Sequence, residues 1–479
     1  MKRNLLTRAA LFGAAAIAIL PAFAQAPSQT SPLPAAAPGS IRARAAQLRD
    51  EALSNDRVAW NITEDLTTEV GPRLAGTEAE ERARAWAVAR LNSLGFQGVR
   101  VETFDMPVWV RGEERAEIVS PFPQPLVLTA LGNSGATPAR GLTADVVGFE
   151  NIEDLERAPD AAVRGRIVFV SHQMPRTQDG SSYGYFGRAR REGPSIASRK
   201  GAAAIVIRSI GTDYHRNPHT GVQTWAEGVR PIPAAALSLP DAEQLQRILL
   251  RANGRPVRMS LTLTPRNIGR RQSGNVFAEV PGRDPSAGIV MVACHLDSWD
   301  TGTGAFDDAA GCGIVTAAAH RIMQAGQPLR TIRIVWFGAE EVGLFGGLDY
   351  LRRHGSENHA AIAESDFGAD RVWRFDSRLN AAARPVVDEI ARLLFPLGVV
   401  RGPVTEASGS DIGPLSASGV PTIQLQQDGT RYFDFHHTPD DTLDKIDPSQ
   451  LRQNVAAWTA MLAVTAEAPV QLGPVEPKR

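Results

Sequence analysis

One stretch of the chain, residues 295–313 with the sequence HLDSWDTGTGAFDDAAGCG, most constrains how this protein folds. The run before it, Ile289 to Cys294, is short, apolar and β-branched, which is typical of a buried parallel strand. The residues from Asp308 to about Gln324 are rich in alanine and carry apolar side chains at helical spacing. A strand, a polar loop and a helix in this order predict an α/β fold with a ligand site where the strand ends.

The polar side chains of this loop suit a divalent metal ion. His295 and Asp297 follow the predicted strand, and Asp307 precedes the predicted helix. Imidazole and carboxylate groups together are ligands for zinc or a similar ion, and the glycines of the loop let the backbone fold closely around it. The alternative is that His295 is a buried, hydrogen-bonded histidine and Asp307 an ordinary acid at a helix N-terminus.

The composition excludes several classes of protein. The chain has 479 residues, of which 43% are hydrophobic and 22% charged, so it is expected to be globular and to bury a large core. Its net charge of -1 gives no reason to expect nucleic acid or an anionic membrane as a partner.

The first residues predict a secretory signal peptide over 1–24. Basic residues near the start precede a run of Ala, Leu and Ile, and Ala22-Phe23-Ala24 forms a small-x-small cleavage pattern. A flexible leader rich in Pro, Ala and Ser is expected over 25–40. No other stretch is apolar for long enough to span a bilayer, so we expect an exported protein, periplasmic or secreted, without stable membrane association after cleavage. An uncleaved anchor is the alternative.

The two cysteines, Cys294 and Cys312, both lie in or beside the central stretch. They are too few for a disulfide scaffold, and buried packing is the expected role of each. The sequence leaves open whether they are bonded to each other.

Between about residues 118 and 264 the chain changes character, because short β-branched runs replace the long helical patterns found elsewhere. This change predicts an inserted domain over 118–264, within a main domain formed by 41–117 and 265–470 and followed by a tail, 471–479. The histidines of the insert are dispersed, and surface or hydrogen-bonded positions are expected for them: His172, His215 and His219.

A second candidate site follows the next predicted strand, Thr331 to Phe337, which leads into Gly338, Ala339, Glu340 and Glu341. Two adjacent carboxylates at a strand end repel each other unless a cation or a shared proton offsets the repulsion. One of them can bind a metal ion while the other acts as general base towards a bound water. The alternative is an exposed acidic pair at the start of a surface helix, which the glycines that follow disfavour.

Further candidate ligands lie towards the C-terminus. A short apolar run leads to Asp366, with Asp370 and Asp376 as competitors that composition does not rank. A later loop contains His436 and His437, and neighbouring residues of an extended loop point in opposite directions, so at most one is expected to reach a given metal. The collected set exceeds the four ligands of a structural zinc. It therefore predicts two ions that share a bridging acid, with a bridging water as nucleophile.

Four motifs in this order carry a resemblance to a known family: HLDSWDTGTGAFDD, GAEEVGLFGG, ESD and HHTPDDT. Together they resemble the co-catalytic zinc metallopeptidases of family M28, and among them the chain is most similar to the carboxypeptidase Q branch. The resemblance covers nearly all of the chain after the leader. It implies a three-layer α/β fold, a mixed sheet flanked by helices, with a β-rich insert of the protease-associated type over 118–264.

The resemblance also implies a metal ligand set with two zinc ions per chain. Asp307 would bridge both ions, His295 and Asp366 would complete one, and Glu341 and His437 would complete the other. The second histidine of the loop is chosen because the family's metal-binding histidine immediately precedes a Thr or Ser.

Two further roles follow from the resemblance. Glu340 would be the general base that takes a proton from the bridging water. Asp297 would lie behind His295 and fix its tautomer. A cis peptide bond is implied between Asp307 and Asp308.

The resemblance implies an exopeptidase or dipeptidase that acts on short peptides, and it suggests a homodimer. It favours dipeptides and unblocked substrates, but the sequence does not decide which end of the peptide is recognised. The alternatives are a glutaminyl-cyclase-like acyl-transfer enzyme with one zinc per chain and a non-catalytic binding module on the same fold. Near the site, loop capping and surface charge are the expected roles of Ser410, Asp411 and Arg431.

Overall fold

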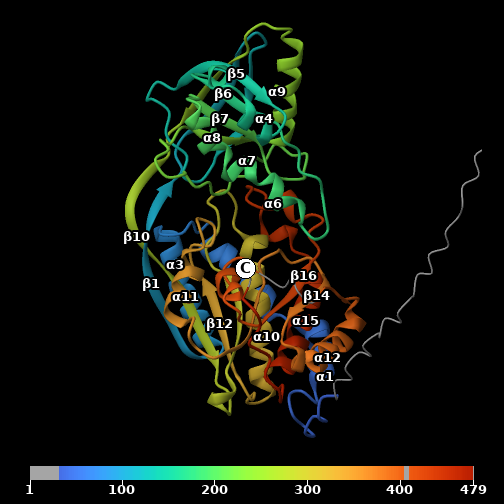
Figure 1. Cartoon of the computed structure of the whole chain (residues 1–479). Coiled ribbons are helices and arrows are strands. Elements are labelled where there is room, and N and C mark those ends of the chain that lie inside the picture. Colours follow the sequence, from blue (N-terminus) through green and yellow to red (C-terminus); the bar gives the residue numbers. More distant parts are fainter. Residues whose placement is uncertain (1–31, 404–408, 478–479) are drawn as a thin grey trace, which may run out of the picture.

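The computed structural model describes residues 32–403 and 409–477. It contains two eight-stranded sheets, one in the lower body of Figure 1 and one in the upper part. The predicted signal peptide, residues 25–31 of the predicted leader and the last two residues of the tail lie outside the described residues.

The lower, central sheet has the strand order β1-β10-β12-β11-β13-β16-β14-β15. β11 pairs in parallel with β12 and β13, whereas β10 and β12, and β14 and β16, are antiparallel, so the sheet is mixed as predicted. The carboxyl ends of β11, β12 and β13 meet at one edge of the sheet. The strands are β1 (Gln97–Val110), β10 (Arg266–Val280), β11 (Ile289–His295), β12 (Thr331–Phe337), β13 (His359–Glu364), β14 (Val372–Arg378), β15 (Val400–Arg401) and β16 (Thr422–Gln427).

Helices cover both faces of this sheet, because alternate side chains of each buried strand point to opposite faces. On one face Val292 and Ile334 belong to the largest core cluster, with helices α1 (Ala45–Asn55), α2 (Val58–Asp65), α3 (Glu78–Ser93), α10 (Ala310–Ala325), α12 (Arg384–Leu394) and α15 (Pro448–Thr465). On the other face Ala293 and Val335 pack with α11 (Phe345–His354) and α13 (Gly413–Ala417). The result is the predicted three-layer arrangement.

The second sheet has the order β3-β2-β9-β5-β6-β7-β8-β4. The chain enters it from β1 and leaves it into β10, and these two long strands pair with each other along most of their length. Its elements are β2 (Glu114–Ser120), β3 (Gln124–Leu126), β4 (Leu128–Ala130), β5 (Leu142–Phe149), α4 (Ile152–Arg157), α5 (Asp160–Val163), β6 (Ile167–Val170), α6 (Ser182–Phe186), α7 (Arg188–Arg191), α8 (Gly193–Arg199), β7 (Ala204–Arg208), β8 (Ala234–Leu237), α9 (Leu239–Arg251) and β9 (Arg258–Leu263).

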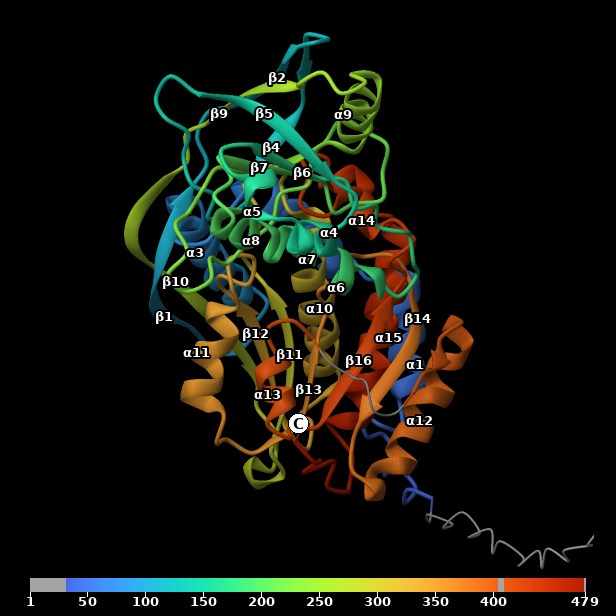
Figure 2. The same ribbon diagram turned by 45° about the horizontal axis from the view of Figure 1, so that its top comes forward.

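The second sheet thus begins at Glu114, a few residues before the predicted boundary, and ends one residue before it. It carries helices and four strands in parallel, β5 to β8, beside its antiparallel pairs. That it is an insert of the protease-associated type stays a prediction. Helices α6 and α7 lie between the two sheets in both views (Figures 1 and 2), next to the edge where the central strands end.

A disulfide bond joins Cys294 at the end of β11 to Cys312 in α10, with their Cα atoms 5.1 Å apart. The pairing that the sequence left open is therefore present. It fastens β11 to α10, one residue before His295. No helix in the described part of the chain is long and apolar enough to cross a membrane.

Candidate metal centre

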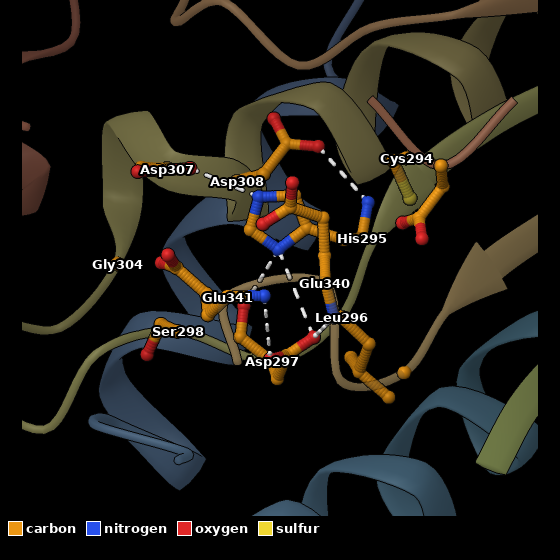
Figure 3. A network of polar contacts seen from close by, with 12 residues as sticks. Cys294, His295, Leu296, Asp297, Ser298, Gly304, Asp307, Asp308, Glu340 and Glu341 are labelled. Carbon is orange, nitrogen blue, oxygen red and sulfur yellow. Dashed lines mark hydrogen bonds and ion pairs between the residues drawn. The ribbon is translucent and has the colours of Figure 1, made fainter. Parts of the chain in front are cut away.

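The polar residues predicted at the strand ends do converge on one place. His295 is the last residue of β11, Glu340 and Glu341 follow β12, and Asp366 follows β13. Because these three strands are parallel neighbours, their ends project into the same space. Figure 3 shows His295, the two glutamates and Asp307 gathered there.

Asp307 lies at the middle of this group, in a short π-helical turn (Ala305–Ala309) before α10. Its Oδ1 is 2.9 Å from Nε2 of His295, and its Oδ2 is 3.4 Å from Nε2 of His437. The peptide bond between Asp307 and Asp308 is cis, as the family resemblance implied.

Each side of Asp307 has one further acid. On one side Nε2 of His295 is 3.4 Å from Oδ1 of Asp366, and on the other Nε2 of His437 is 2.8 Å from Oε2 of Glu341. His295, Asp307, Glu341 and His437 are all buried. The five predicted ligands therefore form two groups that share one carboxylate.

The two loop histidines lie differently from the prediction. Their rings stack on each other with centroids 3.5 Å apart instead of pointing in opposite directions, because the loop is not extended there and His437 has a positive φ of 62°. Nε2 of His436 is 3.8 Å from Oδ2 of Asp307. His437 is the closer of the two to Asp307, and it also contacts Glu341.

The competitors of Asp366 are placed elsewhere. Asp370 forms an ion pair with Arg431, and Asp376 forms one with Arg374. The pairing of Arg431 corrects its expected role as simple surface charge. Asp411 is also not a surface residue, since it is 1% exposed and its Oδ1 accepts a hydrogen bond from the Gly347 amide.

Asp297 supports the site in a different way from the one expected. Nδ1 of His295 donates to the backbone carbonyl of Asp297 at 2.9 Å, whereas the Asp297 carboxylate is 3.9 Å away. The carboxylate instead accepts hydrogen bonds from the amides of Glu340 and Glu341, at 3.1 and 3.3 Å. The carbonyl thus fixes the tautomer that leaves Nε2 of His295 free for a metal, and the carboxylate fixes the turn that carries the glutamates.

Sequence reasoning missed two groups that hold the loop around Asp307. The carboxylate of Asp441 accepts hydrogen bonds from the amides of Phe306 and Asp307, at 2.6 and 3.2 Å. Asp441 belongs to the HHTPDDT motif, so its presence there was the available signal.

The second missed group is the fully buried guanidinium of Arg73. It donates to the backbone carbonyls of Leu296, Thr303 and Gly304, at 2.5, 2.6 and 2.9 Å. Its positive charge lies beneath a cluster of acids, and more than 220 residues separate it from the loop, so no local pattern marks it.

Residues of the loop between β7 and β8 hold the histidine loop. The amide of Thr220 donates to the carbonyl of His437 at 3.0 Å, and Nδ1 of His437 is 3.3 Å from the Thr220 carbonyl. Nδ1 of His219 is 2.7 Å from the carbonyl of His436. His219 is thus hydrogen-bonded, as expected, and the Thr220 contact leaves Nε2 of His437 free to face Asp307 and Glu341.

The centre opens into a cavity of about 560 Å³. Its wall includes the metal-site residues Asp307, Glu340 and His437. It also includes Tyr183 of α6 and Arg190 of α7. Ser410, for which only a loop-capping role was expected, also lines it. A cavity of this size suits a small ligand.

The electrostatics of the centre favour a cation. Burial, reinforced by the nearby Asp307, raises the pKa of Glu341 well above its usual value, and burial also raises the pKa of Asp307. Burial lowers the pKa of His437, which keeps that imidazole neutral and suited to ligation. Oε1 of Glu341 is buried and has no hydrogen-bond partner among the described residues.

The donor set fits zinc. Ligands bound about 2.0–2.1 Å from one tetrahedral zinc ion lie about 3.3 Å apart, and the nitrogen–oxygen separations within each group run from 2.8 to 3.4 Å. Imidazole and carboxylate are also the ligand types that zinc accepts.

Comparisons with known proteins show the family of the chain. The model of peptidase family M28 matches residues 275–462, a range that contains all five predicted ligands. Carboxypeptidase Q of Bos taurus is 34% identical over 406 residues, which is 84% of each chain. A crystal structure of a peptidase M28 precursor from Shewanella amazonensis is 47% identical, with a TM-score of 0.88 and coverage of 91% of this chain and 99% of its own.

A more distant structure confirms the fold alone. The zinc aminopeptidase BSAP from Bacillus subtilis matches 87% of this chain and 97% of its own with a TM-score of 0.63, at 20% identity. Because the match to carboxypeptidase Q extends over most of both chains and the family model covers the strand ends that form the site, the chain belongs to peptidase family M28 and is a metallopeptidase.

Proposed function

We propose that this protein is an exported di-zinc exopeptidase that hydrolyses short peptides, with Glu340 as general base. The observation that carries the proposal is the position of Asp307, whose two carboxylate oxygens face two different ligand groups. A carboxylate placed in this way is suited to bridge two ions.

In this proposal His295 and Asp366 would hold one zinc ion, Glu341 and His437 would hold the other, and Asp307 would contribute to both. Two zinc ions, when bound, lower the pKa of a shared water towards neutrality and polarise the carbonyl of the scissile bond. The Asp297 carbonyl and the Thr220 carbonyl each keep one imidazole in the tautomer that this binding needs.

Glu340 is the general base that transfers the proton of the attacking water. Its carboxylate lines the cavity and makes no hydrogen bond or ion pair with any residue that the structure describes. Burial, together with the nearby Asp366, raises the pKa of Glu340 well above its usual value. As base, its carboxylate takes a proton from the attacking water and then gives that proton to the nitrogen of the leaving amine.

The substrate and the compartment belong to the same proposal. A cavity of about 560 Å³ has room for a short peptide rather than a folded chain, and the relatives include proteins named carboxypeptidase and aminopeptidase. The signal-like N-terminus supports export to the periplasm or the medium. The homodimer suggested by the family resemblance stays a prediction.

The test is to distinguish the roles of the two adjacent glutamates, Glu340 and Glu341, by substituting each one alone. We expect Glu340→Gln to keep two zinc ions per chain by elemental analysis while its hydrolysis of dipeptides falls by about 10³-fold or more, as for loss of a catalytic group. Glu341→Gln should lose one ion. A control is Glu113→Gln, since Glu113 is an exposed residue paired with Arg115. Loss of metal from Glu340→Gln with retention in Glu341→Gln would reverse the two assignments, and one zinc per wild-type chain would contradict the di-zinc centre.

A further inference from the structure

The cavity contains a cationic side chain, Arg190, that has no role in the proposed hydrolysis. Arg190 belongs to α7, a helix between β6 and β7, and is 4% exposed. It lines the cavity together with Asp307, Glu340 and His437. No acidic side chain of the described residues forms an ion pair with it. A buried cation without an anion is costly, so its presence beside the metal centre needs an explanation.

The hydrogen bonds of Arg190 are incomplete. Nη2 donates to the hydroxyl of Tyr183 at 2.5 Å and Nη1 to the carbonyl of Thr220 at 3.3 Å, whereas Nε is buried and has no partner among the described residues. A guanidinium has five N–H donors. Hydrogen bonds of the described residues therefore account for two of the five donors of Arg190.

Other arginines of the chain show that this arrangement is unusual here. Three more arginines have a buried Nε without a partner, and each has an acid within 4 Å: Arg90 with Asp65, Arg208 with Glu243 and Arg321 with Asp56. Arg190 differs from these because no such acid accompanies it in the part of the chain that the structure describes.

The space for the Arg190 head group is built into the backbone. Gly221 has a positive φ of 136°, and a Cβ atom added to it would lie 2.2 Å from Nη1 of Arg190. Any larger residue at this position would push the guanidinium out of its place. The backbone at Gly221 and the Tyr183 hydroxyl thus hold the head group at the cavity wall.

We propose that Arg190, with the Tyr183 hydroxyl beside it, binds the free C-terminal carboxylate of the peptide substrate. This inference rests on the proposed peptidase function. The guanidinium matches a carboxylate in charge and in its fork of donors, and such charge-assisted pairs are strong when buried. A peptide with a free C-terminus supplies the anion that the protein itself does not provide.

Arg190 lies in the same cavity as the metal-site residues, beside the loop that carries His436 and His437. The ring of Tyr183 lies 5.2 Å from that of His436, which stacks on His437 at 3.5 Å. The Tyr183 ring, whose hydroxyl accepts a hydrogen bond from Arg190, therefore lies beside the histidine loop of the metal centre. Recognition at Arg190 therefore gives the enzyme carboxypeptidase or dipeptidase polarity.

The test compares one dipeptide with a free C-terminus and the same dipeptide as its C-terminal amide, using the full zinc-loaded protein. We expect wild type to prefer the free acid in kcat/KM by about 10- to 150-fold, the value of one hydrogen-bonded charge. Arg190→Met should remove this preference by slowing the acid and not the amide, and Arg190→Lys should restore part of it. Arg188→Met is the matched control, because Arg188 lies on the same helix but pairs with Glu153 and Glu192.

A binding measurement gives a second readout. In the Glu340→Gln background, calorimetry should show that Arg190→Met weakens binding of the free dipeptide and leaves binding of the amide unchanged. If zinc-loaded wild type cleaves acid and amide at equal rates, the role of Arg190 is refuted and the peptidase function stands. If it cleaves neither, the proposed function itself fails. Should Arg190→Met not fold, as judged by circular dichroism, the wild-type ratio and Arg190→Lys decide.

Discussion

The two halves of the metal centre are positioned by different parts of the molecule. His295 and Asp366 stand at the ends of adjacent parallel strands, so the hydrogen bonds of the central sheet fix their separation. His437 stands on a loop with a left-handed backbone, and the loop between β7 and β8 holds it. Asp307 belongs to both halves. The strand half therefore depends on the core, whereas the histidine of the other half, which also contains Glu341 after β12, depends on contact with the loop between β7 and β8.

The largest effect is expected where the halves meet. Asp307→Ala removes the carboxylate that faces both ligand groups, so we expect both zinc ions to be lost and peptide hydrolysis to fall by about 10⁴-fold or more, as when a catalytic unit is removed. Metal content by elemental analysis and dipeptide turnover check this. Asp388→Ala, at an exposed residue paired with Arg401, is the control. Retention of one tightly bound ion would show that Asp307 is not shared.

The loop half can be tested alone by comparing its two histidines. His437→Ala should lose one of the two zinc ions, because Nε2 of His437 contacts both Asp307 and Glu341. His436→Ala should keep both, since His436 is 3.8 Å from Asp307 and forms no ion pair with Glu341 in the described structure. Titration of the apo-protein with zinc counts the sites. The opposite result would assign the ligand to His436.

The same division explains what the sequence could predict. The strand-end residues His295, Glu340, Glu341 and Asp366 follow short apolar runs, and the rule that parallel strands end at one edge was enough to bring them together. The loop histidines have no such rule. Their ring directions depend on the positive φ of His437, which no local pattern signals, and the expectation of opposite directions was wrong.

Supporting residues were harder still. Arg73 and Arg190 act on the site from segments far away in the chain, and each looks like an ordinary surface cation in the sequence. The sequence also did not show which group of Asp297 supports His295. Only the fold shows that the Asp297 carbonyl faces His295, while its carboxylate faces the turn at Glu340. Tertiary contacts, and not composition, decide such roles.

Acid should weaken zinc binding at both halves. Burial lowers the pKa of His295, but Asp366 and Asp307 outweigh it and raise that pKa well above the usual value, and burial raises the pKa of Glu341. Without metal these groups hold protons, and zinc must displace them. Affinity should therefore fall by about tenfold per pH unit for each proton released as the pH drops. Calorimetry in buffers of different ionisation enthalpy counts the protons, and a pH-independent affinity would contradict these directions.

The smallest change in zinc affinity is expected when the support of the histidine loop is removed. This change tests most directly whether the two halves of the metal centre are positioned independently. His219 lies in the loop between β7 and β8, with Nδ1 2.7 Å from the His436 carbonyl and Nε2 2.7 Å from Asp213. His219→Ala removes this support without touching a ligand, so we expect zinc affinity to fall by about tenfold at one site only, as for other residues that orient ligands. His215→Ala, at an exposed histidine of the same segment, should change neither site. Equal weakening of both ions in His219→Ala would show that the two halves are not positioned independently.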